Sequence, residues 1–140
     1  MNVIAFEPKH VYQMKLQSHQ MRLVSQMALE YIEVLRTLGP AFSGEVDGRI
    51  IVCGGIATQF PGVGTMWACL SQDSGPYFVR LHRCGKRLME SLSLRRIEAS
   101  TEADFAPGCR WLEMLGFQSE GRMRSYGLNG EDHIRYARVM

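Results

Sequence analysis

The sequence has no long apolar run, and no stretch of it approaches the ~20 residues that a membrane-spanning helix requires. Its first ten residues, MNVIAFEPKH, contain neither a basic segment nor a long apolar one, so we expect no signal peptide. No internal repeat and no low-complexity linker divides the 140 residues. The sequence therefore predicts one soluble domain in the cytoplasm, without a membrane as partner.

Closely spaced metal ligands are lacking as well. The cysteines, Cys53, Cys69, Cys84 and Cys109, lie far apart, and no C-x-x-C pair occurs. Zinc sites of the finger type need ligands in such pairs, and none is present here. Widely spaced cysteines in a reducing compartment are typical of free thiols. We therefore expect free cysteines and no bound metal.

An excess of charge of one sign is also absent, because the net charge is only +2. The charge is uneven, with 5 Lys+Arg against 6 Asp+Glu in residues 1–79 and 11 against 8 in residues 80–140. No nucleic-acid recognition motif accompanies the positive charge, so nucleic acid is not an expected partner. The basic C-terminal half fits an anionic ligand and a plain solvated surface equally well.

The hydrophobic pattern predicts an alternation of strands and helices. Strands are expected at residues 2–7, on both sides of the Asp47-Gly48 turn within 42–58, at 65–71, at 95–100, and as a pair after Phe117 about Asn129-Gly130. Helical spacing covers residues 10–38 with a break near 18–20, then 77–92, and then a loop and helix within 101–115. The order β α α β β β α β α β β indicates an α/β fold with a mixed sheet and helices on its faces.

Two stretches carry a family resemblance. RWLEMLGFQSEG, at residues 110–121, contains a Leu-Gly-Phe junction followed by Glu-Gly, and VDGRIIVCGGI, at residues 46–56, has the form of a hairpin. With the element order, they resemble the GNAT family of acyl-CoA-dependent N-acetyltransferases over nearly the whole chain. The resemblance implies a single GNAT-like domain over residues 1–140. It also implies that acetyl-CoA, as co-substrate, gives its acetyl group directly to an amine of a small molecule or a protein.

The resemblance also implies where the cofactor would lie. In the family, the fourth strand splays from the fifth and its backbone hydrogen-bonds the pantetheine arm, while the following loop and helix start hold the pyrophosphate. The matching segments here are residues 66–70 and 72–77. The cofactor-binding residues implied in this way are Trp67, Ala68, Cys69, Leu70, Gln72, Ser74, Gly75 and Arg80.

The pyrophosphate loop has two registers in this sequence. The family writes it as Gln/Arg-x-x-Gly-x-Gly/Ala, and both QDSGPY, at residues 72–77, and RLHRCG, at residues 80–85, match it incompletely. Only the first leaves enough chain before Ile97 for a helix that crosses back over a sheet. We therefore expect the first register, which brings Asp73 close to the phosphates and puts Tyr77 where the family has a small residue.

Two functional positions of the family are changed. Where the family often has a tyrosine that protonates the leaving thiolate, this sequence has Leu112, and an asparagine common about seven residues earlier falls near Phe105. The candidates that remain are Tyr126 and Tyr136 as acid or acceptor contacts, Glu98 and Glu102 as bases acting through water, and Glu45, His82 and His133 as weaker bases. For each of them, a packed aromatic ring or an exposed charge is the competing interpretation.

The last two strands are expected to form one wall of the acceptor cleft, with Gly116 turning the chain out of the preceding helix and Phe117 anchoring it in the core. Arg122, Arg124, Arg135 and Arg138 lie in this wall, which predicts an acceptor that carries a carboxylate or phosphate.

A second function follows from a weaker resemblance. The GTMWACLS strand, the missing tight glycine loop and the RWLEMLGF helix are similar to small GNAT-like proteins of short-tailed bacteriophages. That resemblance implies a catalytically silent domain with a structural or virion role. A homodimer is a further expectation for this protein.

Overall fold

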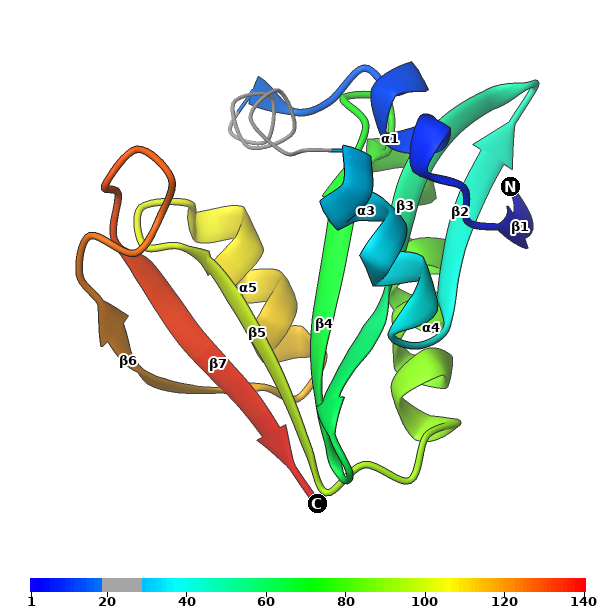
Figure 1. Ribbon diagram of the computed structural model, residues 1–140. Helices are drawn as coiled ribbons and strands as arrows, with labels where there is room; N and C mark the ends of the chain where they lie inside the picture. Colours follow the sequence, from blue (N-terminus) through cyan, green and yellow to red (C-terminus); the bar gives the residue numbers. More distant parts are fainter. Residues whose placement is uncertain (19–28) are drawn as a thin grey trace.

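The computed structural model describes residues 1–18 and 29–140 and contains one seven-stranded mixed sheet (Figure 1). The strands stand in the order β1-β2-β3-β4-β5-β7-β6, and of the neighbouring pairs only β4 and β5 run parallel. Their bounds are β1 (Asn2–Ala5), β2 (Ala41–Val46), β3 (Arg49–Phe60), β4 (Val63–Leu70), β5 (Arg96–Glu102), β6 (Gln118–Met123) and β7 (His133–Val139). The structure confirms the predicted α/β class with a mixed sheet, and the predicted order of strands and helices along the chain broadly fits.

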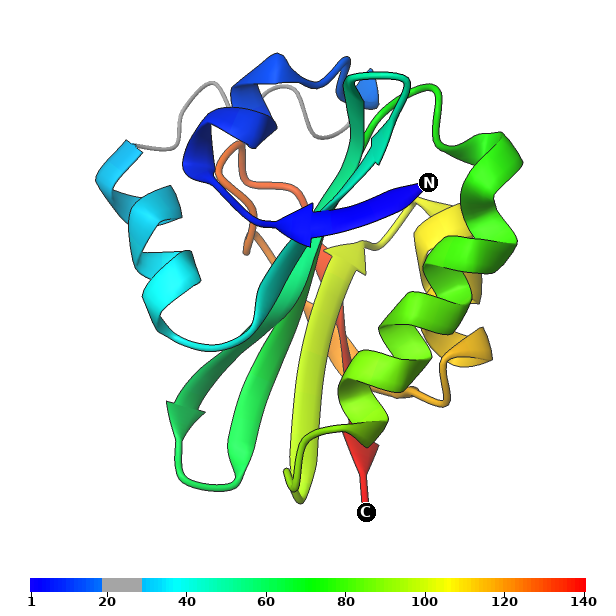
Figure 2. The same ribbon diagram turned by 90° about the vertical axis from the view of Figure 1, so that its right-hand side faces the viewer.

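The helices cover parts of both faces of the sheet (Figure 2). They are α1 (Pro8–Gln13), α3 (Leu29–Thr37), α4 (Phe78–Glu90) and α5 (Ala106–Met114), with a 3₁₀ turn at Gly75–Tyr77 before α4. The first of the two helices predicted within residues 10–38 begins earlier, at Pro8, and ends at Gln13, because Leu16, which the helical spacing included, forms a β-bridge with Ser71 instead. The part of the prediction that includes Met21, Val24 and Met27 lies outside the described residues. None of the described helices is long and apolar enough to cross a membrane.

Two hydrophobic cores lie on opposite faces of the sheet. One packs α1 and α3 against β2–β4 and includes Phe6, Val11 and Ile32. The other packs α4 and α5 against the centre of the sheet and includes Met89 and Leu112. No described helix lies over β5, β7 and β6 on the side away from α5, and we call this side the uncovered face (Figure 1).

The helix that ends on Leu-Gly-Phe behaves as predicted. Gly116 has φ +94°, its N–H donates to the carbonyl of Glu113 (3.0 Å), and the Phe117 N–H donates to the carbonyl of Leu112 (3.0 Å). This pair of hydrogen bonds is a Schellman cap, which ends α5 with a residue in the left-handed region. Phe117 is only 3% exposed and lies in the α4–α5 core, so it anchors the start of β6.

Replacing Gly116 by alanine is expected to lower the free energy of unfolding by ~1–2 kcal/mol, because a Cβ atom is strained at positive φ. Space is not the obstacle, since the nearest atom to the new Cβ would be Arg138 Nε at 3.6 Å. Gly75→Ala is the matched control, because Gly75 has no positive φ and no atom within 4 Å of that position. Urea unfolding should show a change within about 0.5 kcal/mol for the control. Equal losses in the two variants would contradict the cap.

Candidate active site

The central feature of the sheet is the divergence of β4 from β5 (Figure 1). Backbone pairing joins Val63 to Arg96, Gly64 to Ile97 and Thr65 to Glu98, and then stops. Met66–Leu70 and Ala99–Glu102 continue without pairing to each other, as the sequence predicted. Two parallel strands that separate in this way can present backbone groups to an extended, amide-rich ligand, although Ala68 and Leu70 of β4 already interact with other groups.

Part of the β4 edge is taken by the chain that follows α1. Leu16 forms an isolated antiparallel bridge with Ser71, and the Gln17 N–H donates to the carbonyl of Leu70 (3.1 Å). Gln72 continues the contact, because its backbone N–H donates to the carbonyl of Lys15 (2.7 Å) and its side-chain amide donates to the carbonyl of Leu16 (3.0 Å). The end of β4 is therefore closed by a segment far away in the sequence.

The loop predicted to hold pyrophosphate does connect β4 to α4, whereas RLHRCG lies inside α4, which excludes the second register. The loop turns back on itself, with the Asp73 N–H bonded to Ser71 Oγ (3.1 Å) and the Ser74 N–H to the carbonyl of Ser71 (3.2 Å). Between residues 72 and 75 of the described loop, only the Gly75 N–H makes no hydrogen bond. The loop therefore offers an anion one free amide and the start of α4, which fits a pyrophosphate only in part.

The remaining features of the loop are compatible with an anion. The Asp73 carboxylate turns toward Arg49 on β3, 3.4 Å from its guanidinium, so it does not stand alone beside the loop. Arg80 and Arg83 are exposed on the first turns of α4. Gly75 is surrounded by open space.

The side chains of β4 belong to the interior. The Trp67 ring packs against Phe6, with 5.2 Å between ring centroids, and Cys69 is 8% exposed. Burial raises the pKa of the Cys69 thiol to about 11, and burial raises that of its cross-strand neighbour Cys53 to about 12. Both thiols therefore stay protonated at neutral pH, and neither is a nucleophile.

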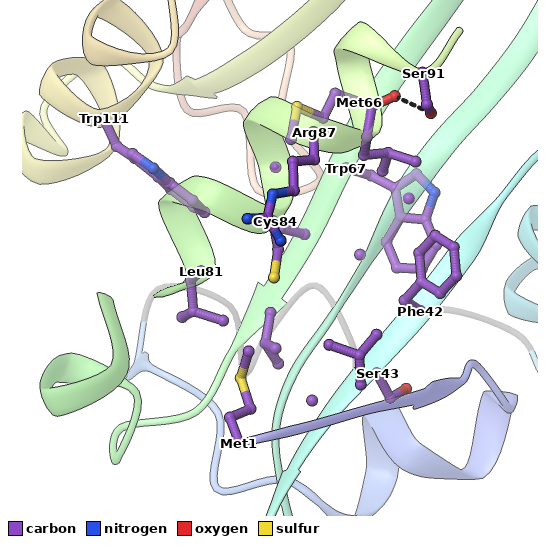
Figure 3. A pocket seen from close by; sticks show the side chains of 18 residues that line it. Met1, Phe42, Ser43, Met66, Trp67, Leu81, Cys84, Arg87, Ser91 and Trp111 are labelled. Atoms are coloured by element: carbon purple, nitrogen blue, oxygen red, sulfur yellow. Dashed lines mark hydrogen bonds between the residues drawn. The ribbon is translucent and has the colours of Figure 1, made fainter. Parts of the chain in front are cut away.

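An apolar cavity of about 350 Å³ lies between α4 and strands β2–β4 (Figure 3). Its walls include Phe42, Met66, Leu81, Cys84 and Trp111. The Trp111 ring also packs against Phe78 at the start of α4, with 5.6 Å between centroids. Such a lining suits aliphatic groups and not phosphates, so this cavity is distinct from the loop described above.

The uncovered face carries the carboxylates that the sequence singled out. Because Ile97 and Ala99 are buried in the α4–α5 core, strand alternation puts Glu98 and Glu102 on the opposite side. Glu98 is held by two arginines, with Arg135 Nη1 at 3.0 Å and Arg96 Nε at 3.3 Å. Each oxygen of the Glu98 carboxylate is therefore occupied by a guanidinium group.

Glu102 has a different environment. It is the cross-strand partner of His133, and its carboxylate makes no ion pair within residues 1–18 and 29–140. His133 Nε2 lies 3.4 Å from Glu131 Oε1, and the Tyr126 ring packs on the imidazole with 5.2 Å between centroids. Tyr126 is 52% exposed and lies below the Arg135 guanidinium, 5.9 Å from its ring centroid. The structure thus brings Glu102, Tyr126 and His133 together, and adds Glu131.

The predicted basic wall is wrong. Arg122 pairs with Asp132 (2.7 Å), and Arg135 pairs with Glu98. Arg138 neighbours the buried Tyr136 on β7 and lies against Gly116, beneath the end of α5. Arg122 is paired across the strands with Ile134, which packs in the α4–α5 core, so the register places Arg122 on the α5 side of the sheet. Of the four arginines, Arg135 lies on the uncovered face, where Glu98 neutralises it, and Arg124 is exposed just beyond the end of β6.

Tyr136 is a core residue and not a contact for the acceptor. It is 4% exposed, and its hydroxyl donates to Glu113 on α5 (3.3 Å). Burial raises its pKa, and hydrogen bonds with Cys109 and Glu113 raise it further, so the hydroxyl stays protonated.

Of the weaker bases predicted from the sequence, Glu45 lies on β2 and His82 on α4, both away from the uncovered face.

A row of interacting side chains, Glu7, His10 and Ser43, joins α1 to β2 and has the acid–histidine–serine order of a hydrolase triad. His10 Nδ1 lies 2.8 Å from Ser43 Oγ, and His10 Nε2 lies 3.4 Å from Glu7 Oε2. Ser43 is 1% exposed and His10 6%, so no substrate reaches the hydroxyl. We interpret the row as a buried link that fixes α1 to the sheet, since buried polar groups require partners.

Solved structures share this fold over almost the entire chain. Ard1 from Thermoplasma volcanium matches with a TM-score of 0.81 at 13% identity, covering 99% of this chain and 97% of its own. The ribosomal-protein-S18-alanine N-acetyltransferase from Escherichia coli matches with 0.79 at 15%, covering 99% and 92%. An acetyltransferase (GNAT family) from Bacillus anthracis matches with 0.69 at 16%, covering 98% and 93%.

The chain therefore has the fold of the GNAT N-acetyltransferases, as the Leu-Gly-Phe junction and the element order predicted. No protein-family model matches the sequence, and no curated protein matches it either. At 13% to 16% identity this likeness establishes the fold alone, because one fold supports many activities.

Proposed function

We propose that the protein is an acyl-CoA-dependent N-acetyltransferase. The observation that supports this best is the divergence of β4 from β5 after Thr65 and Glu98, in the fold of known acetyltransferases. Acetyl-CoA would lie along Met66–Leu70, with its pyrophosphate near Gly75, the start of α4 and Arg80. The loop amides already bound to Ser71 and Lys15 make this a weaker anion site than a free glycine loop.

In the proposed reaction, the nitrogen of a neutral amine attacks the thioester carbonyl. A C–N bond forms, the C–S bond breaks, and coenzyme A leaves as a thiolate that takes up one proton. The amine loses one proton, which we assign to Glu102 through a water molecule, because Glu98 is occupied by Arg96 and Arg135. Tyr126 or water returns a proton to the thiolate, since Leu112 has no proton to give.

The acceptor is an amine of a small molecule or of a protein. With Arg135 neutralised by Glu98 and Arg122 on the opposite side of the sheet, the uncovered face gives no advantage to an anionic acceptor, and the free carboxylate of Glu102 favours a neutral or cationic one. A cytoplasmic location, a phage origin and a homodimer stay predictions from the sequence.

Thioester cleavage measured with a panel of amines tests the proposal. We expect kcat/KM for neutral and cationic acceptors to exceed that for matched anionic ones by about tenfold, or ~1.4 kcal/mol. Glu102→Gln should lower kcat, whereas Glu90→Gln, an exposed carboxylate on α4, should change nothing. Preference for an anionic amine would contradict the charge argument. Loss of activity in both variants would show that the effect is not specific to Glu102.

A catalytically silent domain is the second candidate, and the engaged amides of the 72–75 loop favour it. It predicts that wild-type protein gives no heat with acetyl-CoA in isothermal titration and no turnover with any acceptor in the panel.

A further inference from the structure

The uncovered face contains a cluster of side chains that are able to ligate a metal ion. Glu102, Glu131 and His133 each offer one ligand atom, and these atoms all lie within 4.8 Å of one another. His133 Nε2 lies 3.4 Å from Glu131 Oε1. Two ligands about 2.1 Å from a tetrahedral zinc ion stand roughly 3.4 Å apart, so this pair already has the required separation.

The backbone fixes all three residues. Glu102 and His133 are direct partners in the β5–β7 ladder, and the ladder extends one step further through a hydrogen bond from the Ala103 N–H to the carbonyl of Asp132 (2.9 Å). Directly opposed residues of a ladder have Cβ atoms about 5 Å apart, which lets their side chains meet at one ion.

Glu131 is oriented by hydrogen bonds of its own. Its Oε2 accepts from the Asn129 N–H (3.0 Å), and its backbone carbonyl accepts from the Gly127 N–H (2.9 Å). Oε1 therefore remains directed at His133. Hydrogen bonds of this kind position the ligating atoms in known metal sites, and here the Tyr126 ring holds the imidazole in place.

The charge of the cluster is not balanced by the protein. Glu102 makes no ion pair in the part of the chain that the structure describes, and the only ion partner of Glu131 there is His133. Two arginines of the same face are already engaged, Arg135 with Glu98 and Arg96 with both Glu98 and Glu120. His133 and Glu131 are 18% and 32% exposed in their side chains, so water screens the two carboxylates only partly.

From this geometry we propose that Glu102, Glu131 and His133 bind a divalent transition-metal ion of the zinc class. One imidazole and two carboxylates suit zinc, manganese, iron, cobalt or nickel, whereas calcium and magnesium take oxygen ligands. Three protein ligands leave at least one position for water or for a group of a bound molecule. The proposal does not depend on acetyl transfer, although a metal here would occupy Glu102 and therefore inhibit that reaction.

Isothermal titration of the tag-free full chain with ZnCl₂ tests the site without any acyl-CoA. We expect one equivalent of zinc to bind, and the affinity to fall at least tenfold in Glu102→Gln and in His133→Gln. Glu90→Gln is the matched carboxylate control and should bind as wild type does. Circular dichroism and the Tm of each metal-free variant show whether weaker zinc binding comes from loss of a ligand or from unfolding. Glu102→Gln is the conservative change of the two, because Glu102 is partly exposed.

Zinc binding to thiols is the main competing explanation. Cys84 and Cys109 are partly exposed, so Cys84→Ser and Cys109→Ser are titrated beside the other variants. Binding that is lost in the serine variants and kept in Glu102→Gln would overturn the proposal. Absence of zinc binding by wild type would also overturn it. The cluster would then be explained by the contact between His133 and Glu131 alone.

Discussion

Replacing Gly75 by aspartate is expected to weaken acetyl-CoA binding by about 100-fold, or ~2.7 kcal/mol. Gly75 carries the one amide of residues 72–75 that is free in the described loop, and no atom lies within 4 Å of the position that its Cβ would take. An added carboxylate would therefore be tolerated by the fold and would meet the pyrophosphate directly. Two charges 4 Å apart near a protein surface repel by roughly 4 kcal/mol, of which salt screens a part.

Gly75→Asn is the matched control for that experiment, because it has the same shape without the charge. We expect it to lose less than about fivefold in affinity by isothermal titration, or ~1 kcal/mol. Equal weakening by Asp and Asn would mean that shape and not charge matters at this position. Unchanged binding in both variants would place the cofactor elsewhere, and no binding by wild type would favour the silent domain.

The sequence predicted the order of the strands and helices and the position of the loop before α4, because these features depend on local signals. Gly39-Pro40, Asp47-Gly48 and Gly116-Phe117 mark the ends of elements, and the length of chain between Tyr77 and Ile97 was enough to choose the loop register. Each of these signals acts through neighbours in the sequence, so composition and spacing reveal it.

The contacts that decide the chemistry depend on register between distant strands, which spacing does not reveal. Gln72 is bound by Lys15 and Leu16, more than fifty residues away, so a loop that looks free in the sequence is largely engaged. The four arginines of the last hairpin look like a basic wall until the β5–β7 register sets Arg135 beside Glu98.

The cluster of Glu102, Glu131 and His133 depends on strand register as well. The sequence predicted no metal because it has no closely spaced ligands, yet Glu102 and His133 become neighbours across two strands. The Glu-Asp-His run at residues 131–133 before a strand was the one local signal.

Phe117 anchors the start of β6 in the α4–α5 core, so Phe117→Ala is expected to lower the free energy of unfolding by ~3–5 kcal/mol. Phe117 is 3% exposed and packs among Leu112, Leu115 and Tyr136, and the substitution leaves a cavity where the α5 cap meets β6. Met114→Ala is the control from the same turn, because Met114 is 59% exposed and should change stability by less than about 0.5 kcal/mol. Urea unfolding followed by circular dichroism measures both. A loss below about 1 kcal/mol for Phe117→Ala would show that β6 and β7 are held by the sheet alone, and that the Leu-Gly-Phe junction only redirects the chain.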